Sequence, residues 1–195
     1  MNQNLNIQAY CHIRNGEIVL NGKSIFKQNS EAFKDFIKAA YKYLEIDHSK
    51  FFKMDNLSKL AFIAAEVLLK NESEKNIALI LSNKASSIDT DRKHQNAIEN
   101  GFASPAIFVY TLPNICLGEI SIRHQLYSEN AFFVFDEIKP DILFDYSENL
   151  IKEGKAKKSL CGWVDFDNGK YDAFLYIVAN SGTFVHSISE ITRLY

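Results

Sequence analysis

The hydrophobic and polar positions of this chain follow a helical period in several segments. Residues 30–43 place apolar side chains on one face, and Ser30 can cap that helix. Residues 55–70 give the clearest helix, with Asp55 or Asn56 as its cap, and it is apolar on nearly all sides, as is typical of a helix buried between layers. Further helices are predicted near residues 91–99, from Asn114 to about Arg123, and from Pro140 to about Glu153, whereas Pro105 and Pro113 bracket an extended segment.

Continuous apolar runs predict strands that are buried on both faces. Such runs lie at Ile77–Leu81, Ala131–Phe135 and Ser159–Val164. Alternating patterns predict strands over residues 5–12 and Lys170–Ala179, and turn signals at Asn15-Gly16 and Asp167-Asn168-Gly169 allow hairpins, with Glu17–Leu20 as a possible return strand. Because strands alternate with helices, we expect one α/β domain over residues 1–195, layered around a five-stranded mixed sheet.

Composition and charge narrow the class of protein. Hydrophobic residues make up 47% of the 195 and charged residues 24%, as in an ordinary globular domain. The net charge of -2 argues against a nucleic-acid-binding protein, which needs a basic surface. The sequence has no apolar run of about 18 residues that would predict a membrane span, and residues 1–4 do not begin a signal peptide. Three widely spaced cysteines favour reduced thiols, so we expect a cytoplasmic protein.

Few residues offer candidate chemistry. The five histidines do not pair at metal-ligand spacing, and phosphate-binding loops are absent, so we expect neither a metal nor a cofactor. Cys116 follows a possible helix start at Asn114, where a thiolate could be stabilised, although a buried structural thiol is favoured. Asp165 and Asp167 could form a catalytic pair, but the favoured interpretation is that they shape a turn.

Residues 104–130 contain an ordered run of short motifs. The run consists of Ser104-Pro105, Thr111-Leu112-Pro113-Asn114, Gly118, Ser121-Ile122-Arg123 and Ser128-Glu129-Asn130. In order and spacing it resembles the segment that precedes the active site of β-ketoacyl-acyl-carrier-protein synthases. The flanks agree, because Met54–Leu69 resembles the family's buried Ala-rich helix and Leu150–Val164 resembles its helix end, glycine stop and following strand. The resemblance implies the amino-terminal half of the thiolase-like fold, with α-β-α layers.

The resemblance also implies where a nucleophile should lie. The family places a cysteine at the turn between a buried strand and a helix, and that strand corresponds to Ala131–Phe135. Counting forward from Glu129 and back from Leu150 both lead to Glu137, and no cysteine is near. A carboxylate would form a labile anhydride with an acyl group, so it cannot replace the thiolate. The family's second half, which supplies two histidines, has no counterpart here, and we therefore expect no catalytic residue.

The expected function is that of a non-catalytic ketosynthase-like subunit. We expect a chain-length-factor-like partner in fatty-acid or polyketide synthesis, of the aryl-polyene or resorcinol pigment type. It would form a homodimer, or a heterodimer with a full-length ketosynthase, through Ala131–Phe135, and an acyl carrier protein is a possible further partner. Two alternatives stay open: an enzyme that handles acyl thioesters with Cys116 or Glu137, and a homodimeric scaffold without acyl chemistry.

Overall fold

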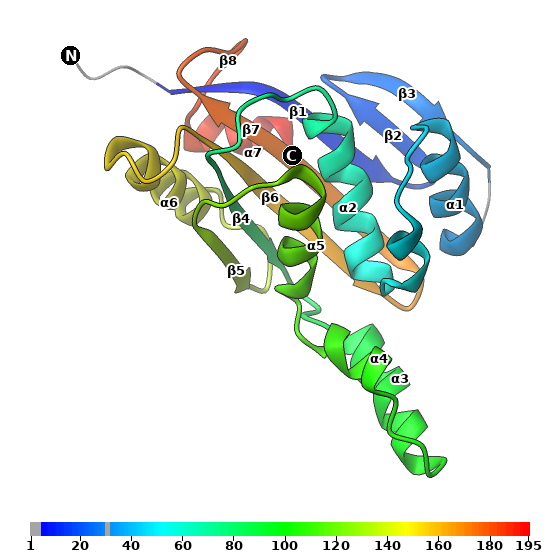
Figure 1. Ribbon diagram of the computed structural model, residues 1–195. Helices are drawn as coiled ribbons and strands as arrows, with labels where there is room; N and C mark the ends of the chain where they lie inside the picture. Colours follow the sequence, from blue (N-terminus) through cyan, green and yellow to red (C-terminus); the bar gives the residue numbers. More distant parts are fainter. Residues whose placement is uncertain (1–4, 30–31) are drawn as a thin grey trace.

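The fold is built on one mixed sheet. The computed structural model describes residues 5–29 and 32–195. Within these residues the strands run in the order β3-β2-β1-β7-β6-β4-β5, and β8 pairs with β1 (Figure 1). Their bounds are β1 Asn6–Arg14, β2 Glu17–Leu20, β3 Lys23–Lys27, β4 Ile77–Asn83, β5 Asn130–Val134, β6 Lys158–Asp167, β7 Lys170–Ala179 and β8 Phe184–Val185. β4 runs parallel to β5 and β6, and the other pairs are antiparallel.

The expected count of five strands is wrong, because the described residues form eight. The Asn15-Gly16 and Asn21-Gly22 turns, all four residues at positive φ, add β2 and β3 to the edge beside β1. β3 was not predicted, since its residues are partly exposed and carry no continuous apolar pattern. The Asp167-Asn168-Gly169 turn is confirmed, with Asn168 and Gly169 at positive φ between β6 and β7.

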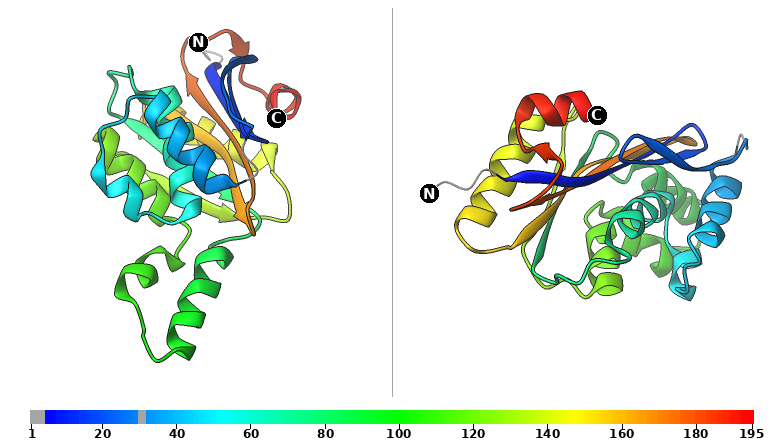
Figure 2. Two further views of the ribbon diagram at one scale, coloured as in Figure 1. Left: turned by 90° about the vertical axis from the view of Figure 1, so that its right-hand side faces the viewer. Right: turned by 90° about the horizontal axis from the view of Figure 1, so that it is seen from above.

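Helices cover both faces of the sheet. Their bounds are α1 Phe33–Tyr43, α2 Asn56–Leu69, α3 Ile88–Glu99, α4 Pro105–Phe108, α5 Ile115–His124, α6 Pro140–Lys152 and α7 Ile188–Leu194, with short 3-10 turns η1 Ser49–Lys53 and η2 Val109–Thr111. α1, α2 and α5 lie on one face, and α6 and α7 lie on the other (Figures 1 and 2). Each face has its own apolar core, so the expected α-β-α layering is confirmed.

The predicted helix starts agree in part with the structure. α2 begins at Asn56, and the Asp55 carboxylate accepts a hydrogen bond of 2.8 Å from the backbone N–H of Ser58, so Asp55 is the cap. α1 begins at Phe33, but the cap proposed for it, Ser30, lies outside the described residues. The extended segment expected between Pro105 and Pro113 is wrong. Pro105 instead takes the first turn of α4, where its missing N–H costs nothing.

The predicted strands differ in burial because their places in the sheet differ. All seven residues of β4 are buried, since β4 lies between two neighbours and under helices on both faces. The run Ala131–Phe135 falls on β5, whose residues are half-buried or exposed rather than fully buried. The reason is that β5 ends the sheet and has a neighbour on one side only.

Within residues 5–29 and 32–195, no single helix is both long and apolar enough to cross a bilayer. Pro105–Thr111 and Ile115–His124 reach that length and composition only when taken together, and they are bent by 97°.

Candidate functional site

The loop from β5 to α6 is where the nucleophile would lie. Glu137 is in this loop, its side chain 75% exposed, and Lys139 Nζ donates to its Oε1 at 2.8 Å. The hydrogen bond and charge of Lys139 lower the pKa of Glu137 below its ordinary value. α6 begins three residues later, at Pro140, and the side chain of Lys139 does not cap it. Glu137 is therefore a solvated ion-pair partner of Lys139.

The other candidate nucleophile, Cys116, lies in the second position of α5. Its side chain is completely buried in the core beneath α2. Burial raises the pKa of the Cys116 thiol far above its ordinary value, which outweighs the lowering effect of nearby backbone N–H groups. Cys116 is thus a protonated core residue at neutral pH, and the structure does not bring it to the surface loop that holds Glu137.

One side of β5 has no neighbouring strand within residues 5–29 and 32–195. Leu79 N–H donates to Glu129 O at 3.0 Å, and Phe135 N–H donates to Asn83 O at 2.8 Å. In a parallel pair, alternate residues of each strand form the hydrogen bonds to the neighbouring strand. Residues 131 and 133 of β5 therefore face β4 together with Glu129 and Phe135. The N–H and C=O groups of Asn130, Phe132 and Val134 therefore point away from β4, along an open edge.

The β5 edge is apolar on both faces. Phe132 packs against the core under α5, whereas Phe133 contacts the core beside α6. Phe133 stacks on Phe135 with ring centroids 5.6 Å apart and meets Tyr146 edge-on at 5.5 Å. Val134 is 51% exposed. Open apolar edges of this kind tend to pair with another chain.

The opposite edge of the sheet is protected against pairing. β3 is short, and Lys23 and Lys27 at its two ends are exposed. Lysines on an edge strand disfavour the addition of another strand, because pairing would desolvate their charges. β5 has no charged residue between Asn130 and Val134. The two edges therefore differ in kind, and β5 is the one suited to a partner.

A helical arm leaves the body beside the carboxyl end of β5. The arm consists of residues 88–112 and contains α3, α4 and η2, and it projects well beyond the sheet (Figures 1 and 2). Thr90 is the one buried residue of α3. Several large apolar side chains of the arm are exposed, among them Phe102 at 66% and Phe108 at 62%. The sequence patterns did not identify this arm.

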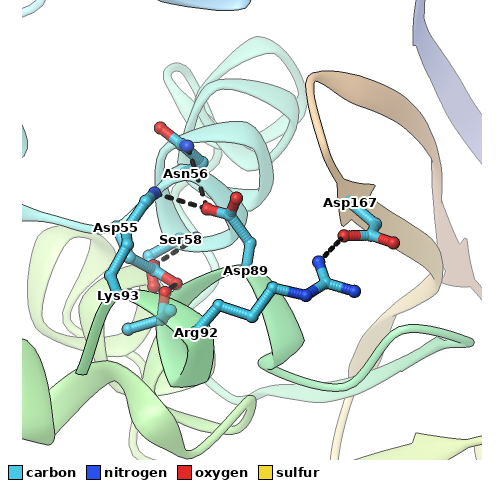
Figure 3. Close-up of polar contacts among 8 residues, drawn as sticks. Asp55, Asn56, Ser58, Asp89, Arg92, Lys93 and Asp167 are labelled. Carbon is cyan, nitrogen blue, oxygen red and sulfur yellow. Dashed lines mark hydrogen bonds and ion pairs between the residues drawn. The ribbon is translucent and has the colours of Figure 1, made fainter. Parts of the chain in front are cut away.

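Polar contacts hold the base of the arm (Figure 3). The Asp55 carboxylate, besides capping α2, accepts a hydrogen bond of 2.8 Å from Thr90 Oγ1 in α3. Asn56 Nδ2 donates to Asp89 Oδ2 at 3.1 Å, and Arg92 forms an ion pair with Asp167 at the end of β6. Burial raises the pKa of Asp55, while its hydrogen bonds from Ser58 and Thr90 act in the opposite direction.

The aspartate pair singled out in the sequence belongs to this base. Asp165 Oδ1 accepts hydrogen bonds from the backbone N–H groups of Lys84 at 3.0 Å and Ala85 at 2.8 Å, in the segment that leads into the arm. Asp167 binds Arg92 of α3. Both carboxylates are thus engaged in fixing the arm, which neither the turn interpretation nor the catalytic one anticipated. The sequence around Asp165 and Asp167 does not indicate these partners, because they lie far away along the chain.

The similarity of this chain to known proteins lies in its fold. No protein-family model matches the chain, and no curated protein matches it. Solved structures do match: the ishigamide ketosynthase/chain length factor has a TM-score of 0.63 at 16% identity, over 90% of this chain and 62% of that chain. The chain has the thiolase-like fold of the ketosynthases. It spans about three fifths of the length of this first structure.

Two further ketosynthase structures share the fold. The complex of the ketosynthase ApeO with its chain length factor ApeC from Xenorhabdus doucetiae matches with a TM-score of 0.61 at 12% identity, over 98% of this chain and 90% of that chain. A type II PKS acyl-carrier protein in complex with its ketosynthase, AntDE:AntF, matches with a TM-score of 0.61 at 12% identity, over 92% of this chain and 63% of that chain. The motif run at residues 104–130 therefore pointed to the correct fold.

Proposed function

We propose that this chain is a non-catalytic, chain-length-factor-like subunit that pairs through β5 with a full-length ketosynthase. The observation that carries the proposal is the open edge of β5, where the peptide groups of Asn130, Phe132 and Val134 lack a neighbouring strand within the described chain. Two of the structures with this fold are described as a ketosynthase with a chain length factor, which supports a heterodimer over a homodimer.

The absence of a nucleophile in the β5–α6 loop supports a role without catalysis. Glu137 stands where the synthase resemblance places a cysteine, and it is solvated and paired with Lys139. Its carboxylate would give a labile anhydride rather than a stable thioester. Residues 1–195 would act as one half-synthase-like domain in the cytoplasm, and the ketosynthase would supply the acyl chemistry of fatty-acid or polyketide synthesis, such as that of aryl-polyene or resorcinol pigments. An acyl carrier protein would deliver substrates to the complex.

The pairing of β5 can be tested by removing a single outward N–H. Val134→Pro deletes a donor that faces away from β4, and proline is tolerated where an edge-strand N–H faces solvent. Val134→Thr is the matched control, because threonine has nearly the same shape and keeps the N–H. The chain is co-expressed with each full-length ketosynthase of the source genome, and the affinity of each purified pair is measured.

We expect the wild-type chain and Val134→Thr to bind one ketosynthase in a one-to-one complex, and Val134→Pro to bind at least about tenfold more weakly. Unchanged circular dichroism of Val134→Pro would show that the fold is kept. A wild-type chain that forms only dimers with itself would favour the homodimeric scaffold, and one that binds no ketosynthase would refute the proposal.

A further inference from the structure

A cavity lies between the start of α2 and the base of the arm. Its volume is about 240 Å³, and its walls come from the chain around the start of α2, from α3, and from α4 and η2. Three lysines line it: Lys53 at the end of η1, Lys59 in α2 and Lys93 in α3. Within the described part of the chain, Asp55 is the only carboxylate of the lining. The lining therefore carries more positive than negative charge.

Each oxygen of the Asp55 carboxylate already accepts a hydrogen bond. Oδ1 accepts from Ser58 N–H at 2.8 Å, and Oδ2 accepts from Thr90 Oγ1 at 2.8 Å (Figure 3). Of the three lysines, Lys93 pairs with Asp89, four residues earlier in α3. The carboxylates at the base of the arm are thus engaged in holding α2 and α3 together.

The other two lysines lack a counter-ion. No ion pair within residues 5–29 and 32–195 includes Lys53 or Lys59, and Lys59 is half-buried. Burial lowers the pKa of Lys59 below its ordinary value, and the charges of Lys93 and Lys34 lower it further, while Asp55 acts in the opposite direction. An anion in the cavity would stabilise this half-buried ammonium group, because a desolvated charge is costly without a partner.

The cations of the lining indicate the kind of anion. Lysine binds a phosphate group as a point charge with three donors, whereas the planar fork of arginine suits two-pronged binding of a carboxylate. The described lining contains lysines and no arginine. A phosphate monoester carries a charge of about −1.5 to −2 at pH 7, which matches the two unpaired ammonium groups of Lys53 and Lys59 better than the single charge of a carboxylate.

The cavity also has apolar lining residues, namely Met54, Ala106 and Ile107. A water molecule takes up about 30 Å³ of the liquid, so a cavity of about 240 Å³ has the volume of roughly eight waters. A phosphate group fills only part of that space. The remainder, beside the apolar residues, suits a small organic group attached to the phosphate.

We propose that this cavity, here named the lysine cavity, binds a small phosphate monoester, with the phosphate group beside Lys53 and Lys59 and the organic group against Met54 and Ile107. Lys93 stays paired with Asp89 and adds to the positive field. Because the walls belong to both α2 and the arm, a bound ligand also holds the arm against the body. The proposal needs only the residues of this chain, so it stands or falls independently of any ketosynthase partner.

The test measures the binding of phenyl phosphate to the full chain by isothermal titration calorimetry at constant ionic strength. Lys59→Gln removes the charge, Lys59→Arg keeps it, and Lys23→Gln removes an exposed charge on β3, outside the cavity. We expect Lys59→Gln to bind at least about fivefold more weakly than wild type, Lys59→Arg within about threefold and Lys23→Gln within about twofold. Equal binding by wild type and Lys59→Gln, or no binding by wild type, would refute the proposal.

Further probes test the class of ligand. Inorganic phosphate has the same head group without the organic part, and benzoate has the ring with a carboxylate. We expect each to bind at least about threefold more weakly than phenyl phosphate, and Ile107→Ser to weaken the binding of phenyl phosphate but not of inorganic phosphate. Benzoate binding as tight as that of phenyl phosphate would overturn the assignment to phosphate, and inorganic phosphate binding as tight would overturn the place given to the organic group.

A spectroscopic measurement locates the bound phosphate. NMR titration of the Lys59 side chain should show its pKa rising when phenyl phosphate is bound, because a neighbouring anion favours the ammonium form. Hydrogen exchange in α3 should slow at the same time, since the ligand joins α3 to α2. A pKa of Lys59 that stays the same in the bound chain would mean that the ligand lies elsewhere, which refutes the proposal. Circular dichroism and thermal melting of the free chains identify any variant that fails to fold, and Lys59→Arg then carries the comparison.

Discussion

At the scale of single residues, the most consequential group is a buried carboxylate between α2 and α5. Glu66 is 1% exposed, and Arg123 donates to it from Nε at 3.1 Å and from Nη2 at 2.8 Å. His124 Nε2 lies 3.2 Å from Glu66 Oε2. Burial alone would raise the pKa of Glu66, but the close contact with His124 and the hydrogen bonds from Arg123 outweigh it and lower the pKa to about 2.

This depressed pKa predicts a loss of stability in acid. Because the folded pKa of Glu66 is below its ordinary value of 4.5, its contribution is full above pH 4.5 and is lost as the pH falls toward 2. Urea unfolding between pH 7 and pH 3 should show a steeper decline for wild type than for Glu66→Gln. Parallel curves for the two proteins would contradict this role of Glu66.

The two candidate nucleophiles give a second prediction at the residue scale. Cys116 is buried with a raised pKa, and Glu137 is exposed on a loop. We therefore expect no stable covalent acyl adduct when the chain is incubated with an acyl-loaded carrier protein and examined by intact-protein mass spectrometry. An adduct that persists in Glu137→Ala but disappears in Cys116→Ala would establish the acyl-thioester enzyme instead. Cys161, also fully buried, serves as a control, since Cys161→Ala should change nothing.

At the scale of elements, the start of α2 and the base of the arm depend on one side chain. Asp55 accepts from Ser58 N–H within α2 and from Thr90 Oγ1 in α3. α2 is the central helix of its layer, and α3 lacks a core, so the same carboxylate stabilises a rigid element and orients an exposed one.

Replacement of Asp55 should therefore affect both elements. Asp55→Ala removes the cap and the link to Thr90, and we expect it to lower the free energy of unfolding by about 1–2 kcal/mol. Asp55→Asn keeps an acceptor oxygen for Ser58 and should lose less than half as much. Chemical denaturation gives the stabilities, and hydrogen exchange should show faster exchange in α3 for Asp55→Ala than for wild type. Unchanged exchange in α3 would mean that the other contacts suffice to hold the arm.

At the scale of the whole molecule, the sheet has one edge that resists pairing and one that invites it. Exposed lysines at both ends protect β3, whereas β5 is apolar and open, with the arm rooted beside it. The polar outer residues of α6, which include Asp141, Asp145 and Asn149, show that the α6 face is solvated along the middle of the helix. Val134 of β5 is among the exposed large apolar side chains, and the open edge of β5 supports a partner on that side.

The sequence by itself determined the elements whose burial is local. Three kinds of local pattern predicted the structure that forms: the apolar run of β4, the helix α2 with apolar residues on nearly all sides, and the Asn-Gly turns, including Asn168-Gly169. Each pattern indicates which faces of the element are buried or which residues need a positive φ. The motif run at residues 104–130 pointed to the fold through its resemblance to a known family, and that fold is confirmed. It also led to Glu137 as the residue in the nucleophile's place, which stays a prediction.

Only the tertiary structure decided what depends on neighbours. The run AFFVF predicts a strand buried on both faces, but β5 lies at the edge of the sheet. The order of the strands depends on the whole chain, so a pattern of five residues cannot indicate it. The roles of Asp165, Asp167 and Thr90 at the base of the arm depend on partners between 35 and 81 positions away. The period of the hydrophobic residues indicates which face of a helix or strand is buried. Ion pairs, strand neighbours and the projecting arm depend instead on distant segments that the fold brings together.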